Sequence, residues 1–188
     1  MILRSLLTAI LLMFSLAACS TGGGAVPAQF TSLKPPIYTL DAGDRVRVTV
    51  YGEQSVNGEY AIGPSGDIAL PLIGDVPAKG KTIEQLQQAV AAKLAAGYIL
   101  DPRVSIEVLN FRPYFILGEV SKPGQYPYMS DLTVDQAVAT AGGFTYRAST
   151  SKVFVRRAGQ AEVEVPLSKG RPIWVKPGDT IRVGERYF

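Results

Sequence analysis

One stretch of the sequence, residues 111–144, constrains the fold more than any other. It begins with an apolar run at residues 114–117, which is the length of a short buried strand. A turn sequence follows, in which Pro123 suits the first central position of a type II turn and Gly124 is expected to supply the positive φ of the second. Because residues 125–128 are extended again, we expect a hairpin here.

A short helix is expected directly after this hairpin. Thr133 is placed to cap the helix, and Gln136, three residues later, completes a capping box. Gly142 and Gly143 end the helical pattern. The apolar stripe recurs at the helical period and consists of Val134, Ala137, Val138 and Ala141.

The order of these residues resembles a known module. Gly-Glu-Val-x-x-Pro-Gly-x-Tyr at residues 118–126, followed by Ala-Gly-Gly-Phe at residues 141–144, is similar to the soluble-ligand-binding β-grasp module of bacterial polysaccharide export proteins. The resemblance implies a β-grasp-like fold in which the motif positions have a structural role. These positions are Gly118, Pro123, Gly124, Gly142 and Gly143.

The preceding part of the chain predicts a second small unit. Apolar and polar residues alternate at residues 45–50 and 103–109, as in strands with one buried face. Residues 63–67 predict a hairpin turn between two further strands. Thr82 and Gln85 form another capping box, which begins a helix whose apolar stripe is Ile83, Leu86, Val90 and Leu94.

This unit also resembles a known domain. Three patterns, at residues 38–50, 65–76 and 102–108, are similar to the polysaccharide export domain, and their shared positions are Gly43, Asp44, Gly66, Pro71, Gly74 and Pro102. We therefore expect an α+β protein of two small β-rich modules, each with a short helix. The expected boundaries are residues 38–110 for the export domain and 111–188 for the β-grasp module with its C-terminal strands.

The first 37 residues predict export and anchoring. Residues 1–18 combine Arg4 with an apolar run that ends in small residues, as in a signal peptide. The ending Leu-Ala-Ala-Cys resembles a bacterial lipobox, which implies acylation of Cys19, and Ser20 resembles the outer-membrane sorting class. An ordinary signal peptide with an incidental cysteine is the alternative. Residues 19–37 are rich in Gly, Ser, Thr and Pro and predict a flexible tether.

Composition excludes several kinds of chemistry. The chain has one cysteine and no histidine, which argues against zinc sites, catalytic triads and an internal disulfide. The formal net charge of +3 is too small to indicate nucleic-acid binding. Gly80-Lys81-Thr82 suggests a P-loop, in which four residues separate the two glycines. Here five residues separate Gly74 from Gly80, so we expect a turn and a helix cap instead.

Two carboxylate pairs, Glu53/Glu59 and Asp131/Asp135, lie in segments that predict surface loops or helix starts. No cofactor is expected. Near the C-terminus, residues 178–183 repeat the pattern of residues 43–48, a Gly-Asp pair before an alternating strand. An old internal repeat or a common turn-to-strand device could explain this, and we favour the second.

The resemblance implies a function without catalysis. Several copies would form a periplasmic ring that conducts capsular polysaccharide or exopolysaccharide, anchored by lipid to the outer membrane, with an inner-membrane polysaccharide co-polymerase as partner. Long family members end in an amphipathic helix that crosses the outer membrane, whereas this sequence ends in a strand-like pattern. We therefore expect a separate outer-membrane β-barrel partner. The alternatives are a periplasmic lipoprotein that binds a small soluble ligand and a carboxylate-dependent glycosidase.

Overall fold

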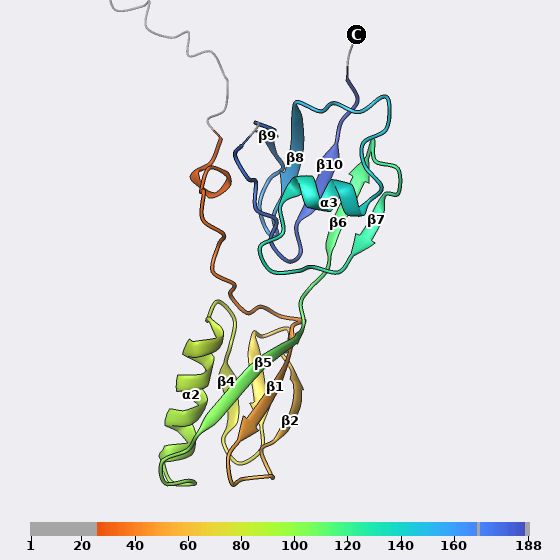
Figure 1. The fold of residues 1–188 in the computed structure, drawn as a ribbon. Helices are drawn as coiled ribbons and strands as arrows, with labels where there is room; N and C mark the ends of the chain where they lie inside the picture. Colours follow the sequence, from red (N-terminus) through yellow and green to blue (C-terminus); the bar gives the residue numbers. More distant parts are fainter. Residues whose placement is uncertain (1–25, 169, 187–188) are drawn as a thin grey trace, which may run out of the picture.

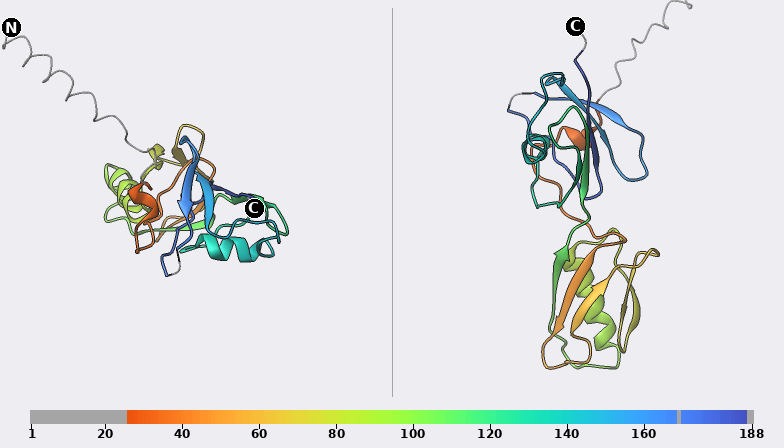
Figure 2. Two further views of the ribbon diagram at one scale, coloured as in Figure 1. Left: turned by 90° about the horizontal axis from the view of Figure 1, so that it is seen from above. Right: turned by 90° about the vertical axis from the view of Figure 1, so that its right-hand side faces the viewer.

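The computed structural model describes residues 26–168 and 170–186 and confirms an α+β protein built from β-rich modules with short helices (Figure 1). Two modules lie end to end (Figure 2). The core of the first draws on residues 40–106, and that of the second on Phe30 and residues 114–183. The predicted signal peptide, Cys19 and Ser20 lie outside the described residues.

The first module packs one helix against small antiparallel sheets. Its three-stranded sheet has the order β2-β1-β5, and a separate hairpin joins β3 to β4. The elements are β1 (Arg45–Val50), β2 (Gly58–Ala61), β3 (Asp67–Leu70), β4 (Gly74–Pro77), α2 (Ile83–Ala95) and β5 (Val104–Asn110).

Local sequence explains these elements. The buried valines of β1 alternate with exposed residues, and Val48 of β1 pairs with Ile106 of β5. The capping box of Thr82 and Gln85 is present at the start of α2. Leu86, Val90 and Leu94 of the predicted stripe are buried, while Ile83 is partly buried at its edge.

The second module is a mixed five-stranded sheet covered on one face by a short helix (Figures 1 and 2). The strand order is β7-β6-β10-β8-β9, in which β10 runs parallel to β6 and all other pairs are antiparallel. The C-terminal strand is thus the centre of the sheet. The elements are β6 (Tyr114–Gly118), β7 (Gly124–Tyr126), α3 (Val134–Thr140), β8 (Lys152–Arg156), β9 (Val163–Pro166) and β10 (Thr180–Val183).

The expected type II turn at Pro123-Gly124 is wrong. Gly124 belongs to β7 and does not have the positive φ that such a turn requires. The chain is held there by long-range hydrogen bonds instead, because Ser121 N donates to Gly143 O (3.0 Å) and Lys122 N donates to Ala141 O (2.8 Å). The reversal before β7 is therefore fixed to the C-terminal end of α3.

Gly118 is the position of this motif where an added side chain would meet the backbone most closely. Its φ is +84°, and a Cβ built there would lie 2.0 Å from the backbone oxygen of Val183. No side chain fits at that distance. The close approach of β6 and β10 therefore depends on the absence of a side chain at residue 118.

The described part of the expected tether, residues 26–37, is attached to the second module. It contains the 3₁₀-helix η1 (Ala28–Phe30), and Phe30 is buried in the core of that module. Ser32 O accepts a hydrogen bond from Trp174 Nε1 at 3.0 Å. The lack of apolar periodicity predicted flexibility, but one buried aromatic residue is enough to fasten the segment.

Candidate functional site

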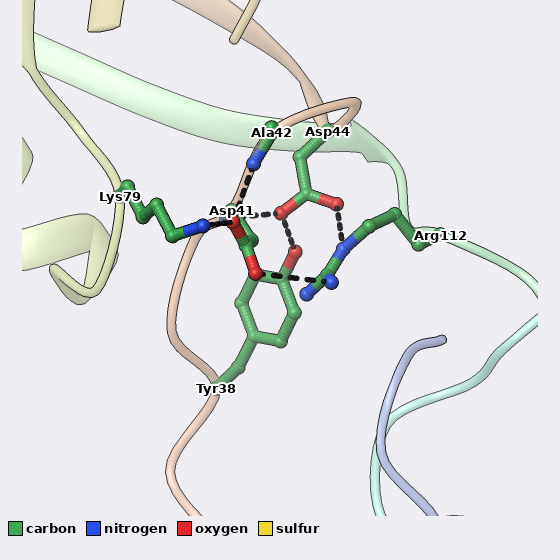
Figure 3. A network of polar contacts seen from close by, with 6 residues as sticks. All are labelled: Tyr38, Asp41, Ala42, Asp44, Lys79 and Arg112. Atoms are coloured by element: carbon green, nitrogen blue, oxygen red, sulfur yellow. Dashed lines mark hydrogen bonds and ion pairs between the residues drawn. The ribbon is translucent and has the colours of Figure 1, made fainter. Parts of the chain in front are cut away.

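The two modules meet at a polar cluster around Arg112, which lies in the link between β5 and β6 (Figure 3). Arg112 Nε donates to Asp44 Oδ1 at 3.1 Å, and Nη1 donates to Asp41 Oδ2 at 3.3 Å. The Asp44 side chain is fully buried. Because an unpaired carboxylate is costly to bury, these bonds fix the link to the first module.

The remaining oxygen of Asp44 is also occupied. Its Oδ2 accepts hydrogen bonds from the Tyr38 hydroxyl and, at 2.8 Å, from the backbone N–H of Asp41 (Figure 3). Burial and then the neighbouring Asp44 carboxylate raise the pKa of Tyr38. Tyr38 therefore remains a protonated donor throughout the ordinary pH range.

Asp41 extends the cluster to the turn after β4. Its Oδ1 lies 3.0 Å from Lys79 Nζ and accepts the backbone N–H of Ala42 at 2.8 Å. Burial acts to raise the pKa of Asp41, but the hydrogen bonds from Lys79 and Ala42 and the charge of Arg112 outweigh it and lower that pKa. Asp41 is thus an ionised partner of both cations.

A second turn of the same geometry lies across the junction. Asp179 Oδ2 accepts the backbone N–H of Lys176, three residues earlier, at 2.8 Å, as Asp44 does from Asp41. Gly43 and Gly178, before the two aspartates, have φ values of +93° and +84°. An internal repeat and a common turn-to-strand device both account for this shared geometry, so our preference for the second stays a prediction.

Arg112 lies between these two turns. A Cβ built on Gly43 would lie 3.9 Å from Arg112 Cγ, and one built on Gly178 would lie 3.5 Å from Arg112 Nη1. Gly178 N also donates to Pro113 O at 3.0 Å. The link between the modules is therefore in contact with a glycine turn of each module.

Aromatic rings continue this contact. The Tyr38 and Phe111 rings meet edge to face with centroids 4.9 Å apart, and Phe111 meets Tyr128 in the same way at 5.6 Å. Tyr38 packs against the core of the first module and Tyr128 against that of the second. Edge-to-face aromatic pairs stabilise a structure beyond the burial of their apolar area, so these three rings stabilise the contact between the modules.

The second module places a buried ion pair at the junction. Arg157 Nε lies 3.5 Å from Asp179 Oδ2, and Nη2 donates to Trp174 O at 3.2 Å. The Arg157 guanidinium also lies over the Phe30 ring, 4.3 Å from its centroid. Burial raises the pKa of Asp179 to about 6, against the opposing effects of the Lys176 N–H and Arg157.

A pocket of about 210 Å³ opens between the modules beside these groups. Its wall includes side chains from the N-terminal segment, from the first module and from the second. Arg112, Arg157 and Lys176 supply positive charge there, and Asp41 and Asp179 supply negative charge. The arrangement of charged and polar groups can bind a polar ligand.

Only two of the predicted motif residues, Gly43 and Asp44, belong to this junction. Gly66, Pro71, Gly74 and Pro102 shape the turns of the first module, and Gly118, Gly142 and Gly143 lie where β6 and α3 end. The sequence interpretation missed Phe30, Arg112, Arg157, Lys176 and Asp179. The repeated Gly-Asp pattern was the available signal for Asp179, because it matches Asp44.

Three of the four predicted carboxylates, Glu53, Glu59 and Asp135, do not line the junction pocket. Burial and then the charge of the fourth, Asp131, raise the pKa of Tyr128. Glu59 pairs with Arg45 and Arg47, and exposed Glu53 accepts hydrogen bonds from Ser55. Asp135 lies in the first turn of α3, where the helix dipole favours it. In residues 26–168 and 170–186, no group of three His, Cys, Asp or Glu side chains could hold a metal ion. No described helix is long and apolar enough to cross a membrane.

The Gly80-Lys81-Thr82 sequence is a turn followed by a helix cap, as predicted. Gly80 has a φ of +77°, and the Thr82 side chain accepts the backbone N–H of Gln85 at the start of α2. Lys81 N donates to Ala78 O within the turn. No phosphate-binding loop forms here.

Comparison with known proteins gives each module a family. Residues 32–109 match the family of polysaccharide biosynthesis/export proteins, and residues 113–176 match the SLBB domain. The chain belongs to the polysaccharide biosynthesis/export protein family. As in the sequence interpretation, the export domain precedes the ligand-binding module, and the Arg112 cluster lies at the boundary between the two matches.

Two curated relatives of this export-family chain are informative. It is 36% identical over 144 residues to the exopolysaccharide production protein ExoF of Rhizobium meliloti (strain 1021). The matched region covers 68% of the chain and 34% of the relative. It is 29% identical over 160 residues to the polysialic acid transport protein KpsD of Escherichia coli, covering 80% of the chain and 29% of the relative. The chain therefore spans about a third of the length of these relatives.

Proposed function

We propose that this protein is a lipid-anchored periplasmic component of a polysaccharide export machine and acts without catalysing a reaction. The observation that carries the proposal is the ordered pair of modules, an export domain followed by an SLBB domain. The names of its relatives, an exopolysaccharide production protein and a polysialic acid transport protein, support a polysaccharide as the cargo. Its contribution would be structural, to form part of the wall of the passage through which the polysaccharide moves.

A ring of identical copies is the assembly we propose. The sheets have unpaired edges at β2 and β5 in the first module and at β7 and β9 in the second. Exposed edges favour pairing with other chains, and closed cyclic symmetry gives every copy the same neighbours. The Arg112 cluster supports this assembly, because a fixed angle between modules is needed for repeated copies to close.

The docked N-terminal segment supports a defined orientation at the membrane. Phe30 fastens the chain to the second module, and only six residues separate Cys19 from Val26. Even a fully extended chain covers at most about 3.6 Å per residue, or roughly 25 Å over this distance. If Cys19 carries acyl chains, the second module lies close to the membrane and the first points into the periplasm, toward the inner-membrane co-polymerase.

The anchor itself is tested by comparing the wild type with a variant in which residues 1–19 are replaced by the cleavable signal peptide of a periplasmic protein that carries no lipid. Two or more acyl chains hold a protein stably on a bilayer. We expect wild-type protein in the outer-membrane fraction and the variant in the soluble periplasmic fraction. Equal membrane association of both would reject lipidation at Cys19.

Native mass spectrometry of the chain extracted in detergent tests the assembly. A ring gives a single closed oligomer, and this result separates the conduit from the alternative of a monomeric receptor for a small soluble ligand. For the proposed β-barrel partner, deletion of its gene is expected to stop export while leaving the ring intact. Export that continues without any such barrel would reject this partner.

A further inference from the structure

Arg157, which lines the junction pocket, has a buried nitrogen without an acceptor. Among the described residues, the buried side-chain nitrogen and oxygen atoms without a hydrogen bond are Nε and Nη1 of Arg157. Nε still lies 3.5 Å from the Asp179 carboxylate, so Nη1 is the nitrogen without any partner. The Arg157 side chain is only 6% exposed. Buried donors are almost always satisfied, so a guanidinium beside a pocket with one unpartnered nitrogen indicates room for a further acceptor.

Two further donors line the same pocket. Lys176 Nζ and the Tyr128 hydroxyl make no hydrogen bond or ion pair with another residue of the described chain. Burial and then the charge of Arg157 lower the pKa of Lys176. The ammonium is thus held in a place where a neighbouring anion would stabilise it.

The charges of the pocket leave one positive charge uncompensated. The charged lining residues and their ion-pair partners comprise four cations, Lys79, Arg112, Arg157 and Lys176, and three carboxylates, Asp41, Asp44 and Asp179. The first-module side is balanced, because Lys79 and Arg112 pair with Asp41 and Asp44. The excess lies with Arg157 and Lys176, which share Asp179.

The size of the pocket limits the ligand. Sites for drug-sized molecules have volumes of about 300 to 1,000 Å³, whereas this pocket has about 210 Å³. Tyr128, which lines the pocket, adds an aromatic side chain to the charged groups. A single sugar unit with one acidic group fits this combination of size, charge and aromatic surface.

We propose that the pocket between the two modules binds the carboxylate of an acidic sugar, with Lys176 and Arg157 balancing its charge and Tyr128 donating a hydrogen bond. The carboxylate supplies acceptors only, which is what the unpaired donors lack. The site itself follows from the geometry, and the identification of its ligand as part of the cargo rests on the proposed export function.

The test uses the fluorescence of Trp174, the single tryptophan of the chain, whose carbonyl oxygen accepts Arg157 Nη2. Purified full-length protein in detergent is titrated with sodium glucuronate, with glucose as the uncharged match and with inorganic phosphate as a free oxyanion. We expect saturable binding of glucuronate and no saturable response to glucose. Equal binding of glucose, or tighter binding of phosphate, would overturn the assignment to a sugar carboxylate.

Lys176→Gln is the decisive variant, since it removes the charge without breaking an ion pair of the described chain. We expect it to weaken glucuronate binding about tenfold or more, because it removes a charge-assisted hydrogen bond. The matched control is Lys122→Gln, an exposed lysine outside the pocket, which should bind as the wild type does. Unchanged affinity in Lys176→Gln would reject the site.

Tyr128→Phe separates the hydroxyl from the ring. It keeps the edge-to-face contact with Phe111 and removes only the proposed donor. We expect glucuronate binding to weaken severalfold while the thermal unfolding midpoint is kept. Export by the wild type is measured in parallel, so that a wild type that exports polymer but does not bind glucuronate would reject the pocket and leave the proposed export function intact.

Discussion

Arg112 and Asp44, 68 residues apart in the sequence, form an ion pair at the junction of the two modules, with Nε 3.1 Å from Oδ1. The carboxylate is fully buried, whereas about a fifth of the arginine side chain is exposed. The pair therefore joins the link between the modules to the turn that begins the first sheet. Gly178 N of the second module donates to Pro113 O of the same link, so the link is held from both sides.

Replacement of Arg112 by Ala tests this role. The change leaves Asp44 buried with only the Tyr38 hydroxyl and the Asp41 N–H as partners. We expect the free energy of unfolding to fall by about 2 to 3 kcal/mol, less than for a fully buried pair because Arg112 is partly exposed. Urea unfolding measures the change. Exposed Arg171→Ala is the control and should be nearly neutral, and an equal loss in both variants would contradict the role of the pair.

Gly118→Ala tests the contact of β6 with β10. The added Cβ would lie 2.0 Å from Val183 O at a φ of +84°, so the strands must separate. We expect a loss of at least about 3 kcal/mol in the free energy of unfolding. Gly159→Ala has a similar φ of +73° with no atom within 4 Å of the new Cβ, and it should lose only about 1 to 2 kcal/mol. Similar losses in the two variants would show that the close approach has no consequence.

Phe30→Ala tests the docking of the N-terminal segment. The change empties a buried position in the core of the second module and removes the ring beneath Arg157. We expect a loss of about 3 to 5 kcal/mol in the free energy of unfolding and faster amide hydrogen exchange in residues 26–32. Leu33→Ala, at a side chain that is 68% exposed, should change neither quantity. Unchanged exchange in Phe30→Ala would contradict the docking.

Asp179 predicts a pH dependence of stability. Its pKa is raised from an ordinary value of 3.8 to about 6, so the folded state binds the proton more tightly than the unfolded chain does. The resulting stabilisation, roughly 2 to 3 kcal/mol, is fully present below about pH 4 and is lost as the pH rises through about 6.

The pH prediction is measured as the difference between wild type and Asp179→Asn in urea unfolding from pH 4 to pH 7. The difference cancels the opposite trend from carboxylates such as Asp41, whose pKa is lowered. We expect wild type to lose stability relative to Asp179→Asn over this interval. Exposed Asp75→Asn should track wild type, and a constant difference between wild type and Asp179→Asn would contradict the raised pKa.

The sequence predicted those parts of the fold whose signals are local. Both capping boxes, at Thr82 and Thr133, appear as expected, because a cap and its partner lie three residues apart. The alternating strand at Arg45–Val50 likewise has the expected burial pattern. Periodicity and capping are properties of a short segment, and packing here does not override them.

The junction could not be predicted in the same way. The partners of Arg112 lie some 70 residues away, and nothing in its own segment indicates them. Gly124 was assigned a turn that local sequence favours, but hydrogen bonds from Ser121 and Lys122 to the end of α3 determine the path of the chain. Phe30 was assigned to a flexible tether for a similar reason, since its partners come from the far end of the chain.

The central claim is that the protein is a structural part of the path by which polysaccharide leaves the cell. The most direct measurement is the amount of polysaccharide on the cell surface and in the periplasm of a strain that lacks the gene, with and without a plasmid copy. We expect little surface polymer in the deletion strain, retained polymer inside the cell envelope, and recovery with the plasmid. Normal surface polysaccharide in the deletion strain would contradict the account.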